Sequence, residues 1–231
     1  KRIGIIIGII VLTVAFIIWR TNLPEIAEPE DNQHQMAQKH QSIFKEKNLM
    51  LGVLAQFFYV GAQVCVSSFF IRFAGTVAGI EEKSAAYFLS AALFGFMIGR
   101  FFGTFLMRYI APSRLLAIYA IINILLLTVA IFTKGYIPVY ALIGVEFFMS
   151  IMFPTIFSLS IQGLGAKTKK ASSFLIMAIV GGAFFPLIMG KVSDASTIQL
   201  AYTVPALCFF IILYFAIKNA KVKSIVMVAG H

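Results

Sequence analysis

The chain has 231 residues, of which 60% are hydrophobic and only 12% are charged, whereas a soluble domain is about half apolar and a quarter charged. This composition excludes an ordinary soluble protein. The net charge of +10 would suggest a nucleic-acid partner for a soluble chain, but no basic stretch is long or interleaved with aromatic residues. We therefore expect no nucleic-acid partner.

The apolar residues are grouped in long blocks, which are separated by short polar stretches. In lipid every backbone polar group must be satisfied within the protein, so such blocks form helices or a closed barrel. Blocks of about 20 residues suit helices that cross a bilayer, and the strict alternation of barrel strands is absent. The sequence therefore predicts an all-α membrane protein with spanning helices at 3–19, 49–71, 84–107, 114–133, 136–161, 171–190 and 199–217.

The first predicted helix, in segment 1–19, is followed by a polar segment, 20–48, that contains prolines and acidic residues and has almost no apolar periodicity. Such a segment is typical of a solvated linker. The later connections are short, so 49–218 is predicted to form one six-helix bundle, which is followed by a tail at 219–231.

One helix, a long linker and six further helices match the layout of transporters that are built from two six-helix halves. In that layout 1–19 is the last helix of the N-terminal half, 20–48 is the central linker, and 49–218 is the C-terminal half. The absence of an initiator Met agrees with a chain that begins inside a longer protein. The alternative is a stand-alone seven-helix receptor or sensor.

The distribution of Lys and Arg predicts the orientation of the bundle in the membrane. If the linker, the turns at 108–114 and 167–170 and the C-terminus share one side, that side carries twelve of the 19 basic residues and the other carries six. Because cytoplasmic loops carry the excess of Lys and Arg, we expect the linker and the C-terminus to be cytoplasmic.

The predicted helix 49–71 carries a row of uncharged polar residues. They follow one another at spacings of three, four and four, which places them on one helical face: Gln56, Tyr59, Gln63 and Ser67. Amides can bond paired hydroxyl groups, and an aromatic ring can cover the apolar face of a pyranose, so this face suits a neutral polyhydroxylated ligand. Hydrogen bonding between helices uses the same residue types and is the alternative.

Glu146 is the only carboxylate inside any predicted span, and its helical face continues through Ser150 and Phe153. Burial favours the neutral form, which would let this residue exchange a proton or donate a hydrogen bond to a ligand. The alternative is a protonated carboxyl group that is bonded to a neighbouring helix. Asn123, which is central in its own span, is a further candidate for ligand binding.

Other residues are expected to have a gating or structural role. Arg100 lies toward the cytoplasmic end of its helix, where its long stem can reach the interface or brace a neighbouring helix. Glycines and prolines that interrupt apolar helices often mark bending points: Pro154, Gly181, Gly182 and Pro186. No nucleophile, carboxylate pair or set of metal ligands lies at the membrane interface, so we expect neither an enzyme nor a metal site.

Four stretches resemble signature segments of the fucose–galactose–glucose:proton symporters, a family of the major facilitator superfamily. They are Ala55–Gln63, Phe148–Leu159, Ser172–Asp194 and Val204–Phe209, and the last resembles the L-fucose branch in particular. The resemblance extends over about residues 49–217, with the segments in order and at the right spacing. It is therefore far more specific than any single motif.

The resemblance implies a major facilitator fold and uptake of a monosaccharide, L-fucose in the first instance, by alternating access. It also implies a proton as coupling ion, no other cofactor, and a monomer in a bacterial inner membrane. The expected partners are the sugar, the lipid bilayer and the missing N-terminal half, to which the family's principal proton-coupling carboxylates belong. The pair Met152–Phe153 before Pro154 is instead familiar from glucose/galactose carriers, which makes these sugars the alternative substrates.

Overall fold

The computed structural model describes residues 12, 13, 16, 20 and 46–228, and for 221–228 it describes the backbone alone. The chain is divided into two compact units, Lys1–Gln41 and Ser42–His231. Every element described below belongs to the second unit. Most of the predicted helix at 1–19, most of the linker at 20–48 and the end of the tail at 219–231 lie outside the described residues. These assignments stay predictions.

Helices build the described part of the second unit. Three spans are single helices: α2 (Lys47–Ala78), α3 (Glu82–Leu106) and α4 (Pro112–Phe132). Three spans are divided: α5 (Ile137–Met149) with α6 (Met152–Ile161), α7 (Thr168–Met177) with α8 (Gly181–Ala195), and α9 (Ile198–Ala201) with α10 (Thr203–Val228). The 3-10 turns η3 (Gly165–Lys167) and η4 (Ala178–Val180) precede α7 and α8. These six spans are long and apolar enough to cross a membrane, which confirms the predicted all-α membrane fold.

Local sequence explains where several of these helices begin and end. Pro112 opens α4 and Pro138 lies in the first turn of α5, positions at which the missing N–H of proline costs nothing. Gly79 follows α2 with a φ of 64°, a conformation that glycine adopts without steric penalty. The backbone N–H of Gly79 then donates to the carbonyl of Gly75 at 3.1 Å. The Thr197 hydroxyl accepts a hydrogen bond from the N–H of Leu200 and caps α9.

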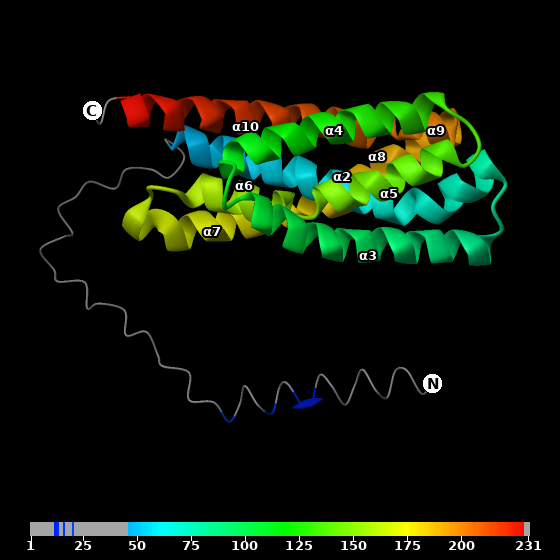
Figure 1. The fold of residues 1–231 in the computed structure, drawn as a ribbon, viewed down its shortest axis with the longest axis horizontal. Coiled ribbons are helices and arrows are strands. Elements are labelled where there is room, and N and C mark those ends of the chain that lie inside the picture. Colours follow the sequence, from blue (N-terminus) through cyan, green and yellow to red (C-terminus); the bar gives the residue numbers. More distant parts are fainter. Residues whose placement is uncertain (1–11, 14–15, 17–19, 21–45, 229–231) are drawn as a thin grey trace, which may run out of the picture. The chain divides into compact units, whose positions relative to one another are not determined.

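The centre of the bundle is α2, which packs against α3, α5, α6, α8 and α10. More than half of its apolar window is buried, whereas only 17% of the corresponding window of α3 is buried. Figure 1 shows α3 along one edge of the bundle. One side of α2, which includes Gln56 and Tyr59, is therefore surrounded by protein, and α3 presents one broad face away from its own bundle.

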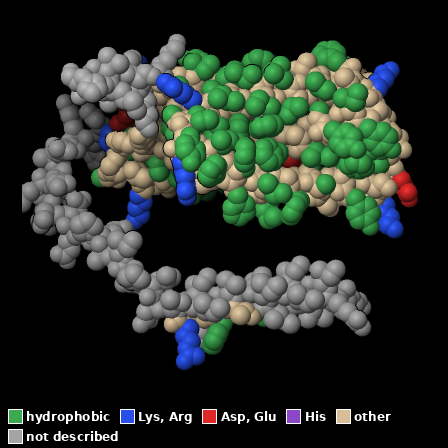
Figure 2. Space-filling view, viewed as in Figure 1, with side chains coloured by type: hydrophobic (Ala, Val, Ile, Leu, Met, Phe, Trp, Pro, Cys, Tyr) green, Lys and Arg blue, Asp and Glu red, His purple; other side chains and the backbone are tan. Residues whose placement is uncertain are grey.

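The outer surface of the bundle is suited to a membrane. Hydrophobic side chains cover the middle of the face shown in Figure 2, and Lys and Arg gather toward its two ends. Large apolar residues such as Phe94, Phe101 and Leu125 are at least half exposed. Soluble proteins rarely expose apolar surface on this scale, so lipid or further protein must cover it.

Glycines set the closest contact between α3 and the α5–α6 span. Gly95, Gly99 and Gly103 recur at every fourth position of α3, the pattern of small residues that lets membrane helices approach closely. A Cβ atom on Gly99 would lie 2.5 Å from the carbonyl oxygen of Phe147 and 2.6 Å from Ser150 Oγ, whereas one on Gly95 would meet nothing within 4 Å. Only part of this glycine row is therefore used for packing.

We expect Gly99→Ala to lower the free energy of unfolding of the protein by about 1–3 kcal/mol, because the added methyl group must displace backbone. Gly95→Ala is the matched control and should be neutral or stabilising by up to about 1 kcal/mol, since Ala favours the helix over Gly. Thermal unfolding in detergent measures both. Equal effects of the two substitutions would contradict the close approach at Gly99.

Candidate functional site

The span formed by α5 and α6 is interrupted near its middle. Ser150 and Ile151 form a two-residue turn between the helices, and α-helical hydrogen bonding resumes with the Thr155 N–H donating to the Ile151 carbonyl at 3.2 Å. Pro154 has no N–H to donate to the carbonyl four residues earlier, which is that of Ser150. The sequence therefore creates a backbone acceptor that its own helix cannot satisfy.

Side chains from two other helices bond the carbonyl groups at this break. The Tyr59 hydroxyl of α2 donates to the Met149 carbonyl at 2.9 Å, and Arg100 Nε of α3 donates to the Ser150 carbonyl at 3.2 Å. The Arg100 guanidinium also lies 5.2 Å from the centre of the Phe96 ring, within the range of a cation–π interaction. Three helices thus meet at the break through polar contacts to backbone.

A hydrogen bond joins Ser67 of α2 to Glu146 of α5. Ser67 Oγ lies 2.5 Å from Glu146 Oε1, while Glu146 Oε2 is buried and has no partner among the described residues. Glu146 is fully buried and Ser67 is half-buried. The structure therefore brings together two residues that the sequence placed on separate faces of two helices.

The remaining polar residues of α2 differ in burial. Gln56 is fully buried, and both polar atoms of its amide lack a hydrogen-bond partner in the described part of the chain. Gln63 is half-buried, and no hydrogen bond joins its side chain to another described residue. The Tyr59 ring lies edge-on to Phe153 with centroids 6.3 Å apart. The predicted face thus runs from a buried end at Gln56 to a partly exposed end at Ser67.

Asn123 lies on the α4 side of the break. Its Nδ2 is 4.0 Å from the sulfur of Met152, its Oδ1 is buried without a partner, and no hydrogen bond connects it to Ser67 or Glu146. One turn earlier, the buried Tyr119 hydroxyl also lacks a partner in the described structure. The structure therefore places Asn123 beside α6, separate from the Ser67–Glu146 pair.

The predicted bending points in the fifth span lie where it packs on α2. A Cβ atom on Gly181 would overlap the carbonyl oxygen of Phe57, and one on Gly182 would lie 2.9 Å from a methyl group of Val64. Pro186 lies inside α8, and the 3-10 turn η4 joins α7 to α8. These glycines permit close packing of α8 on α2, whereas nothing in the structure tests a gating role.

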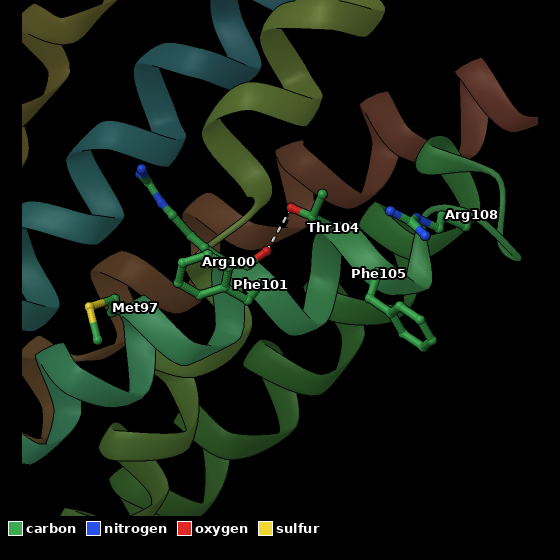
Figure 3. Close-up of a pocket in the computed structure, with 6 residues that line it drawn as sticks. All are labelled: Met97, Arg100, Phe101, Thr104, Phe105 and Arg108. Carbon is green, nitrogen blue, oxygen red and sulfur yellow. Dashed lines mark hydrogen bonds between the residues drawn. The ribbon is translucent and has the colours of Figure 1, made fainter.

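A cavity of about 500 Å³ lies along the outer face of α3, and Figure 3 shows the residues that line it: Met97, Arg100, Phe101, Thr104, Phe105 and Arg108. Thr104 Oγ1 donates to the Arg100 carbonyl at 2.6 Å. The guanidinium of Arg100 points away from that of Arg108 (Figure 3). Because one helix and the turn that follows it supply the whole lining, this cavity is a groove and is distinct from the polar face of α2.

Candidate metal ligands are scattered. Among the described residues no three His, Cys, Asp or Glu side chains lie close enough to hold a metal ion. Cys65 and Cys208 are buried and form no disulfide. The polar residues of the site offer hydrogen bonding by amides, hydroxyl groups, the guanidinium of Arg100 and the one carboxyl group of Glu146.

The structure adds residues to the site that the sequence interpretation missed. Gly99 brings α3 against Ser150, and Tyr119 contributes an unsatisfied hydroxyl that packs beside Phe148 at a ring distance of 5.0 Å. A signal for Gly99 was present in the four-residue glycine spacing of 95, 99 and 103. No comparable signal marked Tyr119.

No protein-family model matches the chain. Among curated proteins, the putative glucose/galactose transporter of Helicobacter pylori is 42% identical over 215 residues, which are 91% of this chain and 52% of the relative. The L-fucose-proton symporter of Escherichia coli is 40% identical over 216 residues, 91% of this chain and 49% of the relative. The chain therefore spans about half the length of the curated relatives it matches.

Solved structures to which the chain is similar are also transporters. FucP, a major facilitator superfamily transporter solved in the outward conformation, superposes with a TM-score of 0.78 at 38% identity, over 93% of this chain and 53% of FucP. A peptide transporter, POT, superposes with a TM-score of 0.68 at 16% identity, which shows a shared fold alone. These similarities confirm the predicted fold and family resemblance, and the relatives are transporters rather than enzymes.

A double-mutant cycle tests the Ser67–Glu146 contact. We expect Ser67→Ala and Glu146→Ala to be coupled by about 1 kcal/mol in the free energy of unfolding, in the range of measured hydrogen bonds between membrane helices. Ser68, which is exposed, supplies the matched control, and Ser68→Ala should be additive with Glu146→Ala. A Ser67 coupling no larger than that of Ser68 would refute the contact.

Proposed function

We propose that this chain, which belongs to the major facilitator superfamily, forms the C-terminal half of a monosaccharide–proton symporter. One observation carries the proposal: within the bundle, Gln56, Gln63 and one oxygen of Glu146 have no hydrogen-bond partner among the described residues. A buried polar group without a partner costs about 1–3 kcal/mol, and residues of this kind inside a membrane are expected to be functional. A sugar offers several hydroxyl groups that can both donate to and accept from them.

The residues around this face have complementary roles in the proposal. The amides of Gln56 and Gln63 bond sugar hydroxyl groups, and the rings of Tyr59 and Phe153 cover the apolar C–H face of the ring. The Tyr59 hydroxyl already donates to backbone, so Tyr59 contributes its ring and its acceptor lone pairs. Glu146, which Ser67 bonds through one oxygen, offers the other oxygen to the ligand. Ser150 and Asn123, whose side-chain oxygens lack partners in the described structure, complete the proposed polar lining.

L-Fucose is the first substrate that we propose, and D-glucose and D-galactose are the second candidates. The L-fucose-proton symporter of Escherichia coli and the glucose/galactose transporter of Brucella abortus are similarly close to this chain, at 40% and 39% identity. The pair Met152–Phe153 before Pro154 favours the second candidates, because it resembles glucose/galactose carriers at this position. Neither substrate changes the proposed role of the amides.

The proposal includes alternating access, with the wall of the cavity that this chain lacks supplied by an N-terminal half. The proton-coupling carboxylates are assigned to that half, so Glu146 is not required to carry the proton. In the proposal the protein lies in a bacterial inner membrane, with the linker and the C-terminus on the cytoplasmic side. The full-length protein is a monomer. The similarity to transporters does not favour a stand-alone receptor.

Uptake by the full-length protein tests this function. We expect cells that express it to accumulate labelled L-fucose, or labelled glucose and galactose if these are the substrates, and a protonophore to abolish accumulation. Residues 1–231 expressed alone should not transport, because they provide one wall of the cavity. Accumulation that persists after the proton gradient has collapsed would exclude symport with protons.

Substitution of Gln63 tests the binding face. We expect Gln63→Ala to weaken sugar binding by about tenfold, the effect of one lost hydrogen bond of about 1.4 kcal/mol, with normal membrane insertion. Gln162→Ala is the control, since Gln162 is exposed at the end of α6. Calorimetric titration of the purified full-length variants measures the affinity. Unchanged affinity in Gln63→Ala would assign the face to helix packing.

A further inference from the structure

We propose that Arg100 is a positioning residue that holds the α5–α6 break in the geometry that the sugar site requires. The inference extends the proposed function, since Phe153 and Glu146 lie on the two sides of this break. Arg100 itself need not touch the sugar. Its role is to supply the hydrogen-bond donor that Pro154 withholds from the Ser150 carbonyl.

The first step of the argument is the accounting of backbone hydrogen bonds. In a continuous α-helix the carbonyl of residue 150 would accept from the N–H of residue 154, but residue 154 is proline. Arg100 Nε takes the place of that N–H at 3.2 Å. In lipid an unsatisfied carbonyl has a large free-energy cost, so the break keeps this geometry only while a donor from elsewhere is present.

The second step is the position of the donor. Gly99 precedes Arg100, and a Cβ atom at Gly99 would lie 2.6 Å from Ser150 Oγ. The backbone of α3 therefore touches the break directly, and the Arg100 stem has only a short distance to cover. Figure 3 shows its guanidinium directed away from Arg108, whose side chain lies at the far end of the groove.

The third step links the break to the proposed ligand face. Glu146 lies one turn before Ser150, and Phe153 lies one turn after it and directly before Pro154. Glu146 accepts a hydrogen bond from Ser67, and Phe153 packs edge-on against Tyr59. A change in the angle between α5 and α6 moves Phe153 relative to Glu146, so the donor to Ser150 sets the spacing of groups that contact the sugar.

Restoring the missing N–H provides the test. Pro154→Ala gives residue 154 a donor for the Ser150 carbonyl, which makes Arg100 dispensable for this bond. In the full-length protein we expect Arg100→Met to weaken binding of L-fucose, D-glucose or D-galactose, whichever binds, by about tenfold with Pro154 present. In the Pro154→Ala background the same substitution should weaken binding less than twofold. Equal losses in the two backgrounds would overturn the proposal.

Two further variants serve as controls for this test. Arg108→Met removes a guanidinium from the same helix without touching the break and should leave affinity unchanged. Arg100→Lys keeps a donor of similar reach and should bind within about threefold of the wild type. This comparison does not depend on how the Pro154 variant folds. A loss in Arg100→Lys as large as that in Arg100→Met would also overturn the proposal.

Thermal unfolding separates this inference from the proposed function. Arg100→Met should lower the unfolding temperature when Pro154 is present and much less when Ala replaces it, whether or not a sugar is bound. If the wild type binds none of the three sugars, the proposed substrate class is wrong while the coupling of Arg100 to Pro154 still decides the structural role. If the coupling is absent from unfolding and from binding, the role of Arg100 is refuted.

Discussion

The constraint on which the site depends is that a carbonyl group inside a membrane bundle needs a hydrogen-bond donor. Pro154 removes the donor that belongs to Ser150, and the helix turns at Ser150 and Ile151. Donors from α2 and α3 then satisfy the acceptors at this turn. The contact from Arg100 replaces the missing N–H of Pro154, and the contact from Tyr59 bonds the neighbouring carbonyl of Met149.

Packing by glycine makes this arrangement possible. A membrane offers little hydrophobic driving force between helices, so close van der Waals contact and hydrogen bonds stabilise their association. Gly99 lets α3 approach the turn, and Gly181 lets the start of α8 approach the carbonyl of Phe57 on α2. The central helix α2 is thereby enclosed on several sides, and its polar face meets Glu146 away from lipid.

The sequence was sufficient to predict the helices and which residues share a polar face. It was not sufficient to predict the hydrogen-bond partners of those polar residues. Apolar blocks of about 20 residues predicted the six spans that the structure describes, because length and hydropathy indicate which helices can cross lipid. Helical spacing placed Gln56, Tyr59, Gln63 and Ser67 together. It carried no information on which atoms across the interface would meet them, since that depends on how the helices pack in three dimensions.

Tyr59 and Arg100 show this limit in detail. Tyr59 was predicted to be a ligand contact, yet its hydroxyl donates to the Met149 carbonyl, a backbone atom that any residue type at 149 would supply. Arg100 was assigned a bracing or gating role because of its long stem, but its partner is likewise a backbone carbonyl. Side-chain patterns cannot reveal contacts of this kind, although Pro154 could have indicated where an unsatisfied carbonyl would arise.

Polar side chains on this face of α2 lack hydrogen-bond partners within the described bundle. Their exposure changes along the helix. Toward Gln56 the face is buried, whereas Gln63, Ser67 and Phe153 are half-exposed. A face that served helix packing alone would have its amides bonded to neighbouring helices, as the Gln199 side chain is to the carbonyl of Thr133 at 2.7 Å. The amide of the half-exposed Gln63 lacks such bonds among the described residues, so its partners must come from a ligand, from water or from the rest of a longer protein. A sugar held between two halves is such a ligand, and its binding requires the rest of the longer protein. We therefore favour a transport site over a face that serves helix packing alone.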